Sequence, residues 1–256
     1  MICPLNLPNP SPLLKEPMKA EINCDMGESY GLYSFGADEE IMPWITVANA
    51  ACGFHGGDPV VLRNTVALAR QHGVKVGAHP GLPDLQGFGR RPMQMQPEEI
   101  TALVLYQVGA LGAFLREQGL ELNHIKPHGA LYGMAAREEA VAHAICDAAE
   151  VYGVPLYGMP HTLHETVYTA RGIPFVAEFY ADLEYDDEGK VIITRKHDAV
   201  DPQWAAERVQ RALDEGLTES ANGKDVPVRP EAICVHSDTP GAVEVAWTIH
   251  GIVASD

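Results

Sequence analysis

The sequence predicts an α/β fold in which a parallel β-sheet closes into a (β/α) barrel, either with the regular eight units or slightly short of that number. Two observations predict it. Short apolar segments with strand character alternate with segments of helical periodicity along the chain, and no linker or change in composition divides them. An open doubly wound sheet is the second choice, because the same alternation also produces that fold.

The predicted strands are short runs rich in small, β-branched or aromatic residues, and they are bounded by Gly, Pro or polar residues. They cover residues 20–23, 46–52, 74–78, 122–126, 154–159, 173–179 and 231–236. Helical spacing with Pro at the start or Gly at the end predicts helices over residues 59–73, 97–119, 137–153, 162–171, 202–216 and 240–252. Residues 39–45 predict a short helix interrupted by Pro43, and residues 183–194 predict a hairpin with its turn at 187–189.

Length and charge exclude several classes of protein. The chain has 256 residues, of which 46% are hydrophobic and 21% are charged, so it can bury a sizeable core. Its formal net charge of -17 argues against binding to nucleic acid or to an anionic membrane surface. No segment approaches the roughly 18 consecutive apolar residues of a membrane span.

The ends of the chain and its cysteines predict the domain organisation and the compartment. Residues 1–17 are rich in Pro and lack the pattern of a signal peptide, so we expect a flexible tail followed by a single barrel domain over residues 18–256. The five cysteines are odd in number, widely spaced and without a CxxC pair. This usage favours a reducing, cytoplasmic setting over a disulfide framework. The sequence leaves homo-oligomerisation open.

Residues able to carry chemistry recur just after the predicted strands. The carboxyl ends of parallel strands converge on one face of the fold, where ligands bind. A lone histidine at such a place is more often structural, but four of the seven strand ends carry one, which favours a shared site. These strand-end residues are Asp25, Glu28, His55, Asp58, His79, Asp84, Lys126, His128, Glu178, Asp182, His236 and Asp238.

The residue types indicate roles but leave alternatives open. Asp25 or Glu28 could serve as a general base or as a metal ligand. Asp25, His55 and His128 together offer the ligand types of a divalent-metal site, although a metal-free hydrogen-bonded cluster explains them equally well.

Three cationic residues of the same region could contact an anionic substrate. Arg90 and Arg91 lie in a Gly-rich loop and could hold a substrate carboxylate. Lys126 could neutralise a carboxylate or an oxyanion, and its structural alternative is an ion pair across the barrel.

Three short patterns carry less weight. The stretch GESYG at 27–31 matches the G-x-S-x-G nucleophile elbow around Ser29, but it follows the first strand and does not open into a helix. The stretch HTLHE at 161–165 fits neither zinc-helix pattern, so His161 and His164 are predicted to be surface residues at a helix start. The sequence contains no G-x-x-x-x-G-K-[ST] motif and therefore lacks a standard P-loop.

Taken together, these motifs resemble the LamB/YcsF family. The matching stretches are INCDMGESYG, NAACGFHGGDP, VGAHPGLPDLQGFGRR, KPHGALY and ICVHSDTPGA, which span residues 22 to 242. The resemblance implies a (β/α)7-type, TIM-like barrel similar to glycoside hydrolases and polysaccharide deacetylases. The family's characterised role is that of the A subunit of 5-oxoprolinase. This role implies ATP-dependent opening of 5-oxo-L-proline to L-glutamate, with ATP handled together with two partner subunits.

The resemblance and the strand-end chemistry together give a set of expected site residues. The expected catalytic residues are Asp25, Glu28, Lys126, His128, His236 and Asp238. The expected substrate-binding residues are Asn23, Asn49, His79, Arg90 and Arg91. By analogy with the deacetylase-type barrels, the expected ligands of a divalent metal are Asp25, His55 and His128.

The sequence also departs from the family pattern. Gly133 stands where the family often has Asn, and the stretches PHTLHET and RKHDAVDP replace more typical sequences. These departures leave open the identity of the lactam and of the partners. Two other functions therefore remain: a stand-alone metal-dependent amide hydrolase or deacetylase, and a non-catalytic subunit that binds a small carboxylate.

Overall fold

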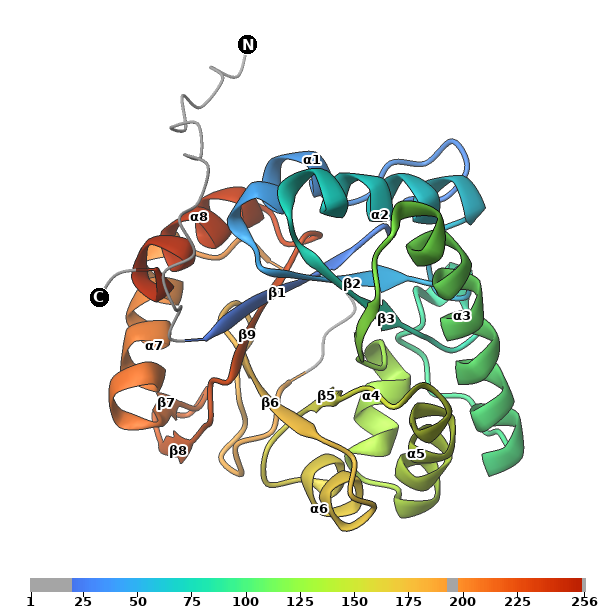
Figure 1. The fold of residues 1–256 in the computed structure, drawn as a ribbon. Coiled ribbons are helices and arrows are strands. Elements are labelled where there is room, and N and C mark those ends of the chain that lie inside the picture. The colour runs from blue at the N-terminus through green and yellow to red at the C-terminus, as the bar shows by residue number, and fades with distance from the viewer. Residues whose placement is uncertain (1–19, 193–197, 255–256) are drawn as a thin grey trace.

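The predicted barrel forms, and it closes completely. In the computed structural model, which describes residues 20–192 and 198–254, seven parallel strands pair in the order β1-β2-β3-β4-β5-β6-β9, and β9 pairs back onto β1. Figure 1 shows the helices arranged around the outside of this barrel. The (β/α)7-type barrel is thus confirmed, and the open doubly wound alternative is wrong. The expected tail, residues 1–17, lies outside the described residues.

The barrel strands agree with the predicted ones in number and order. They are β1 (Glu21–Met26), β2 (Val47–Ala51), β3 (Lys75–His79), β4 (Leu122–Ile125), β5 (Leu156–Gly158), β6 (Phe175–Tyr180) and β9 (Ala232–His236). The helices are α1 (Asp38–Ile41), α2 (Pro59–His72), α3 (Pro97–Gln118), α4 (Gly129–Ala135), α5 (Glu139–Tyr152), α6 (Leu163–Ala170), α7 (Pro202–Glu215) and α8 (Ala242–Val253). Short 3₁₀ turns cover Met42–Trp44, after α1, and Leu85–Gly87, before α3.

The first strand explains how the barrel separates its polar interior from its apolar shell. Side chains alternate along a strand, so Ile22, Cys24 and Met26 point outward into the hydrophobic core between sheet and helices. Asn23 and Asp25 point inward, where both are buried and hydrogen-bonded. The predicted strand ends at Asn23, but the observed strand continues to Met26. Asp25 is therefore held by the sheet ladder rather than by a loop.

Helix ends follow the local sequence signals. Asp58 caps α2 by accepting hydrogen bonds from the backbone N–H groups of Val60 and Val61, and Pro59 occupies the first helical position. Gly73 ends the helix with φ of 68°, a left-handed conformation that favours glycine. The predicted limits of this helix, from Pro59 to Gly73, are confirmed.

Helix α3 is long and apolar enough to cross a membrane by length and composition alone. It is one of the helices of the barrel, however, and it packs between α2 and α5. The side chains of Ile100, Val104 and Leu111 on its inner face are buried in the core. The core helix of a soluble protein passes the same test, so α3 carries no argument for a membrane span.

One helix and one small sheet were not predicted. Helix α4 begins directly after His128, where the sequence indicated only a loop, and its residues 130–135 are buried. Strands β7 (Leu217–Glu219) and β8 (Asp225–Pro227) form a small antiparallel sheet after α7. The predicted hairpin is reduced to a turn closed at Gly189 and a single bridge between Tyr185 and Val191, and its last residues, 193–194, lie outside the described residues.

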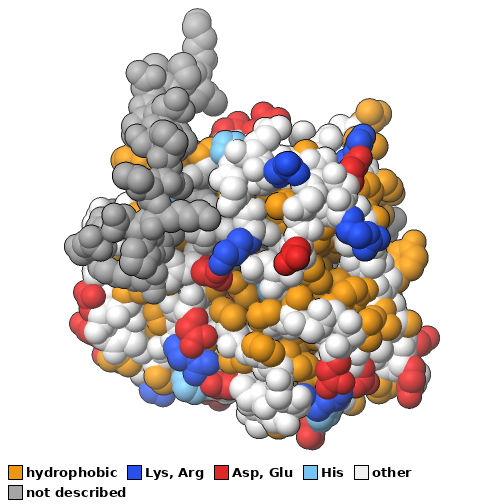
Figure 2. Space-filling view, viewed as in Figure 1, with side chains coloured by type: hydrophobic (Ala, Val, Ile, Leu, Met, Phe, Trp, Pro, Cys, Tyr) orange, Lys and Arg blue, Asp and Glu red, His pale blue; other side chains and the backbone are white. Residues whose placement is uncertain are grey.

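The surface carries charges of both signs. Figure 2 shows apolar side chains gathered toward the middle of the face seen in Figure 1, with acidic and basic side chains between and around them. On this face the Lys and Arg side chains do not form a continuous basic patch.

Candidate active site

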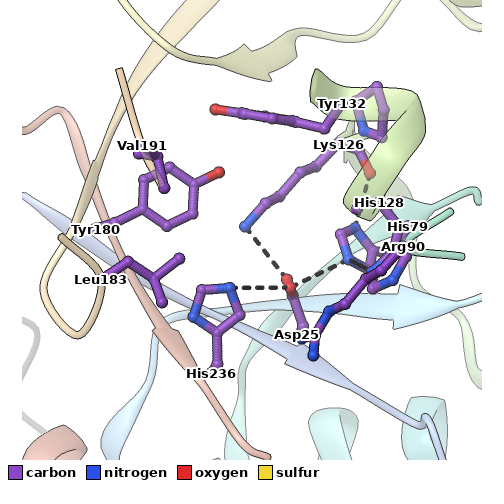
Figure 3. A pocket seen from close by; sticks show the side chains of 12 residues that line it. Asp25, His79, Arg90, Lys126, His128, Tyr132, Tyr180, Leu183, Val191 and His236 are labelled. Atoms are coloured by element: carbon purple, nitrogen blue, oxygen red, sulfur yellow. Dashed lines mark hydrogen bonds and ion pairs between the residues drawn. The ribbon is translucent and has the colours of Figure 1, made fainter. Parts of the chain in front are cut away.

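A pocket opens at the carboxyl ends of the barrel strands, where the sequence predicted a shared site. Its cavity volume is about 40 Å³. Figure 3 shows its side chains converging from several strands and from the loops that follow them. The residues that line it are Asp25, His79, Arg90, Lys126, Pro127, His128, Gly129, Tyr132, Tyr180, Leu183, Val191 and His236.

Asp25 lies at the centre of the polar contacts (Figure 3). Its Oδ1 is 3.2 Å from Lys126 Nζ and accepts a hydrogen bond of 2.8 Å from Asn49 Nδ2. Its Oδ2 is 3.1 Å from His79 Nε2 and 3.8 Å from His236 Nε2. Burial alone would raise the pKa of Asp25, but its contacts with His79 and Lys126 hold it well below its usual value. Asp25 is therefore a carboxylate at neutral pH.

Lys126 bridges two carboxylates across the barrel. Its Nζ is 3.2 Å from Asp25 and 3.0 Å from Glu178, and it also contacts Asn23 Oδ1 and Cys234 Sγ at 3.1 Å each. Burial would lower the pKa of Lys126, but the nearby anionic groups, led by Asp25, raise it well above its usual value. The ammonium group is thus charged, buried and directed at the floor of the pocket.

Asn23 and Asn49 lie beneath the pocket rather than in its wall. Asn49 Nδ2 donates to Asn23 Oδ1 at 2.7 Å as well as to Asp25, and Asn49 Oδ1 is 2.8 Å from His124 Nε2. Both asparagines are fully buried. They were expected to bind substrate, but the geometry gives them contacts that hold Asp25 and Lys126 in place. His124, which completes this layer, was not among the expected residues.

Glu28, His55, His79 and His128 form a second cluster beside Asp25. His55 Nε2 is 3.2 Å and His128 Nδ1 is 3.6 Å from Glu28 Oε1, and the rings of His55 and His128 stack at 3.6 Å. The ligand atoms of all four residues lie within 4.8 Å of one another, so the group could hold a metal ion. Of the predicted ligand set, His55 and His128 belong to this group, whereas Asp25 lies in a second group with Cys234 and His236.

The two arginines of the Gly-rich loop point to different places. Arg90 lines the pocket and pairs with Asp238 at 3.1 Å, and both side chains are buried. Arg91 pairs with Asp84 and lies in a separate surface cleft, with about half of its side chain exposed. The structure therefore brings Arg90 and Asp238 to the site, but it does not bring Arg91 there.

His236 is oriented by a buried carboxylate. Its Nδ1 is 3.0 Å from Asp182 Oδ1, and its backbone N–H donates to Asp182 Oδ2 at 2.8 Å. Burial would lower the pKa of His236, but Asp182 outweighs burial and raises it above the usual value. The Nε2 side of the ring remains directed at Asp25 and the pocket (Figure 3).

This pair predicts a stability contribution that fades as the pH rises. Because the folded-state pKa of His236 lies above its unfolded value, the contribution is complete below about pH 6.5 and is lost as the pH rises through the folded pKa. The difference in the free energy of unfolding between the wild type and His236→Gln should therefore shrink above about pH 6.5. Urea denaturation over a pH series measures this difference in the free energy of unfolding. A difference that stays constant or grows above about pH 6.5 would contradict the pairing of His236 with Asp182.

Besides His124, three residues of the site were missing from the expected set. In the sequence, Glu178 is one of many strand-end residues. It is also the lone carboxylate in the apolar run IPFVAEF, and this could have indicated a site residue, because a buried charge needs a partner. Tyr132 and Tyr180 form the apolar side of the pocket. Tyr132 lies in the stretch KPHGALY. It is buried because it belongs to α4, a helix that was not predicted.

Two of the weaker sequence patterns also have a clear location. The Ser29 hydroxyl bonds to the backbone of Phe35, both as donor and as acceptor, which ties a loop together. His161 is exposed, as predicted, but His164 is fully buried, and its predicted surface position is wrong. His164 Nδ1 accepts from the backbone N–H of Met159, so it holds α6 against β5.

The fold and the site together define a barrel protein whose pocket combines a buried carboxylate, a buried ammonium group and several histidines. Such groups can activate water, stabilise a developing oxyanion and transfer a proton to a leaving group. A model of the LamB/YcsF family matches residues 20–256. The chain belongs to the LamB/YcsF family.

Individual relatives agree with this assignment. The lactam utilization protein lamB of Emericella nidulans is 47% identical over 239 residues, which cover 92% of this chain and 94% of that protein. The 5-oxoprolinase A subunit of Symbiobacterium thermophilum is 48% identical over 231 residues, covering 89% and 88%. The crystal structure of a lactam utilization protein from Thermus thermophilus superposes with a TM-score of 0.85 at 45% identity, covering 91% and 95%.

Proposed function

We propose that this chain is the lactam-handling subunit of an ATP-dependent 5-oxoprolinase. It opens 5-oxo-L-proline, or a related lactam, to L-glutamate together with two partner subunits. The observation that carries the proposal is the buried Asp25–Lys126 pair at the floor of a pocket, in a chain 48% identical to a protein named as the A subunit of 5-oxoprolinase. The buried cysteines, Cys24, Cys52, Cys146 and Cys234, support a reducing, cytoplasmic setting.

The pocket residues have complementary roles in this reaction. Asp25 is ionised and accepts a proton from the attacking water, while Lys126 places positive charge where the carbonyl oxygen becomes negative. His236, held by Asp182, is protonated more readily than an ordinary histidine and donates a proton to the leaving nitrogen. Arg90 stands in the pocket wall, where it can meet the carboxylate of the substrate.

ATP has a separate place in this scheme. Opening an unstrained lactam is uphill unless it is coupled to another reaction, and the chain has no P-loop. ATP is therefore handled with the partner subunits, which activate the lactam for opening in this pocket.

A reconstitution experiment tests the proposal. Glutamate formed from 5-oxo-L-proline is measured for the purified chain alone, for the partner subunits with ATP, and for the complete mixture. We expect product only from the complete mixture, and no tight binding of ATP by the chain alone. Product from the partners without this chain would contradict the proposal.

A second function is favoured by one observation, the Glu28–histidine cluster with its metal-ligand atoms. A stand-alone metal-dependent amide hydrolase would use such a cluster to activate water. Robust lactam hydrolysis by the single chain, without ATP, would support this function instead.

A further inference from the structure

The cluster of Glu28, His55, His79 and His128 is assembled by the fold from four consecutive barrel strands. Glu28 and His55 follow β1 and β2, His79 ends β3, and His128 follows β4. All four side chains are buried, and His79 and His128 also line the pocket. Buried groups of this kind need hydrogen bonds or a bound ion to offset their loss of water.

Two backbone carbonyls determine where the protons of this cluster lie. His79 Nδ1 is 2.8 Å from the carbonyl oxygen of Lys126, and His128 Nε2 is 2.8 Å from that of Phe88. A carbonyl only accepts hydrogen bonds, so both outward nitrogens carry a hydrogen. In the neutral rings the inward nitrogens, His79 Nε2 and His128 Nδ1, are then bare. They face each other at 2.9 Å.

Two bare nitrogens at this distance repel each other unless a positive charge lies between or beside them. The repulsion is greater because Asp25 Oδ2 is 3.1 Å from the same His79 Nε2. An added proton on one ring or a metal ion bound by both rings would remove it. Metal-bound histidines commonly donate their outer N–H to a backbone carbonyl, which is the arrangement of His79 and His128 here.

The other two members favour the metal over the proton. Glu28 Oε1 is 3.2 Å from His55 Nε2 and 3.6 Å from His128 Nδ1. For metal–ligand bonds of 2.0–2.1 Å, the edges of a tetrahedral shell are about 3.3 Å long. The rings of His55 and His128 stack in parallel at 3.6 Å, so one ring must rotate for both to direct an in-plane nitrogen lone pair at the same ion.

We propose that Glu28, His55, His79 and His128 bind one divalent transition-metal ion of the zinc type in the wall of the pocket. Three imidazoles and one carboxylate suit Zn²⁺ and related ions, whereas Mg²⁺ prefers oxygen ligands alone. The carboxylate of this site is Glu28, which the geometry groups with the three histidines, and not Asp25, whose Oδ1 contacts Lys126 and Asn49. The bound ion would place positive charge at the edge of the cavity that His79 and His128 line.

Metal binding by the full chain tests this site without any substrate. Chelator-treated protein is equilibrated with Zn²⁺, dialysed and analysed for metal by mass spectrometry, and Co²⁺ replaces Zn²⁺ as a visible-absorption probe. We expect about one ion per chain and a Co²⁺ spectrum of a four-coordinate nitrogen and oxygen site. Excess Mg²⁺ should not displace the ion. With metal at a hundredfold excess over Kd, the Tm should rise by roughly 5 °C or more.

Variants locate the ion. His55→Gln and Glu28→Gln should each weaken Zn²⁺ binding by at least the roughly 10–100-fold that loss of a supporting group causes. The matched controls are His143→Gln and Glu139→Gln, which change an exposed His–Glu pair on α5 and should bind Zn²⁺ as the wild type does. Wild-type protein that takes up neither Zn²⁺ nor Co²⁺, or His55 and Glu28 variants that bind as tightly as the controls, would overturn the proposal.

The metal site and the proposed reaction can fail separately. Metal content, the Co²⁺ spectrum and the Tm are measured without lactam, ATP or partner subunits. A chain that binds zinc but is not required for glutamate formation would keep the site and remove the proposed function.

Discussion

Turnover in the complete lactam-opening assay is expected to fall by about 100-fold or more when Asp25 is replaced by Asn. The amide keeps the shape of the side chain but cannot accept a proton from water. It also leaves the Lys126 ammonium with Glu178 as its remaining carboxylate partner. The rate of glutamate formation at saturating 5-oxo-L-proline measures the effect. Near-normal turnover by correctly folded Asp25→Asn would remove Asp25 from the mechanism.

The same variant is also expected to lose stability. A charge at an exposed strand end contributes little, but Asp25 is buried within β1 and contacts Lys126 and Asn49. We therefore expect Asp25→Asn to lower the free energy of unfolding by about 1–3 kcal/mol. Asp147→Asn, an exposed position on α5, is the matched control for both turnover and stability. Glu28→Gln should reduce turnover less than Asp25→Asn does.

Replacing Lys126 by Met is expected to have the largest effect on stability. The substitution keeps an unbranched apolar chain but removes the cation that Asp25 and Glu178 share at 3.2 and 3.0 Å. Breaking a buried ion pair by removing one partner typically destabilises by about 3–5 kcal/mol, because the remaining charge is left uncompensated. Urea denaturation measures this loss. Turnover should also fall by about 100-fold or more, since the oxyanion loses its cation.

Two further variants separate charge from packing at Lys126. Lys75→Met removes an exposed lysine that pairs with Glu21 at 2.7 Å, and it should lower the free energy of unfolding by less than about 1 kcal/mol. Adding Glu178→Gln to Lys126→Met removes one of the two stranded carboxylates, so part of the lost stability should return while turnover stays low. Equal losses in Lys126→Met and Lys75→Met would show that the buried pairs do not stabilise the fold.

The barrel could be predicted from the sequence because its signals are local and repeated. Helix α2 begins at Pro59 after an Asp cap and ends before Gly73, and such signals recur along the chain. The convergence of His79, Lys126 and His236 on one pocket followed from the rule that strand ends meet on one face. That rule requires only that the strands are parallel, and the alternation of strands with helices indicated a parallel sheet.

The pairings within the site could not be predicted, since they depend on distances across the barrel. Nothing in the sequence connects Lys126 with Glu178, which lie on different strands. Arg90 and Arg91 are adjacent in sequence, yet Arg90 enters the pocket and Arg91 turns to Asp84. The sequence offered Asp25 and Glu28 as equivalent carboxylates. The structure distinguishes them. Asp25 lies on the inward face of β1 and contacts Lys126, whereas Glu28 follows β1 and contacts His55.

A crystal structure of the chain with 5-oxo-L-proline tests the central claim, that the chemistry takes place at the Asp25–Lys126 pocket. The account predicts the lactam in this pocket, with its carbonyl directed at Lys126 and its carboxylate toward Arg90. Lactam bound instead in the cleft formed by Asp84 and Arg91, with the Asp25–Lys126 pocket left without ligand, would contradict it.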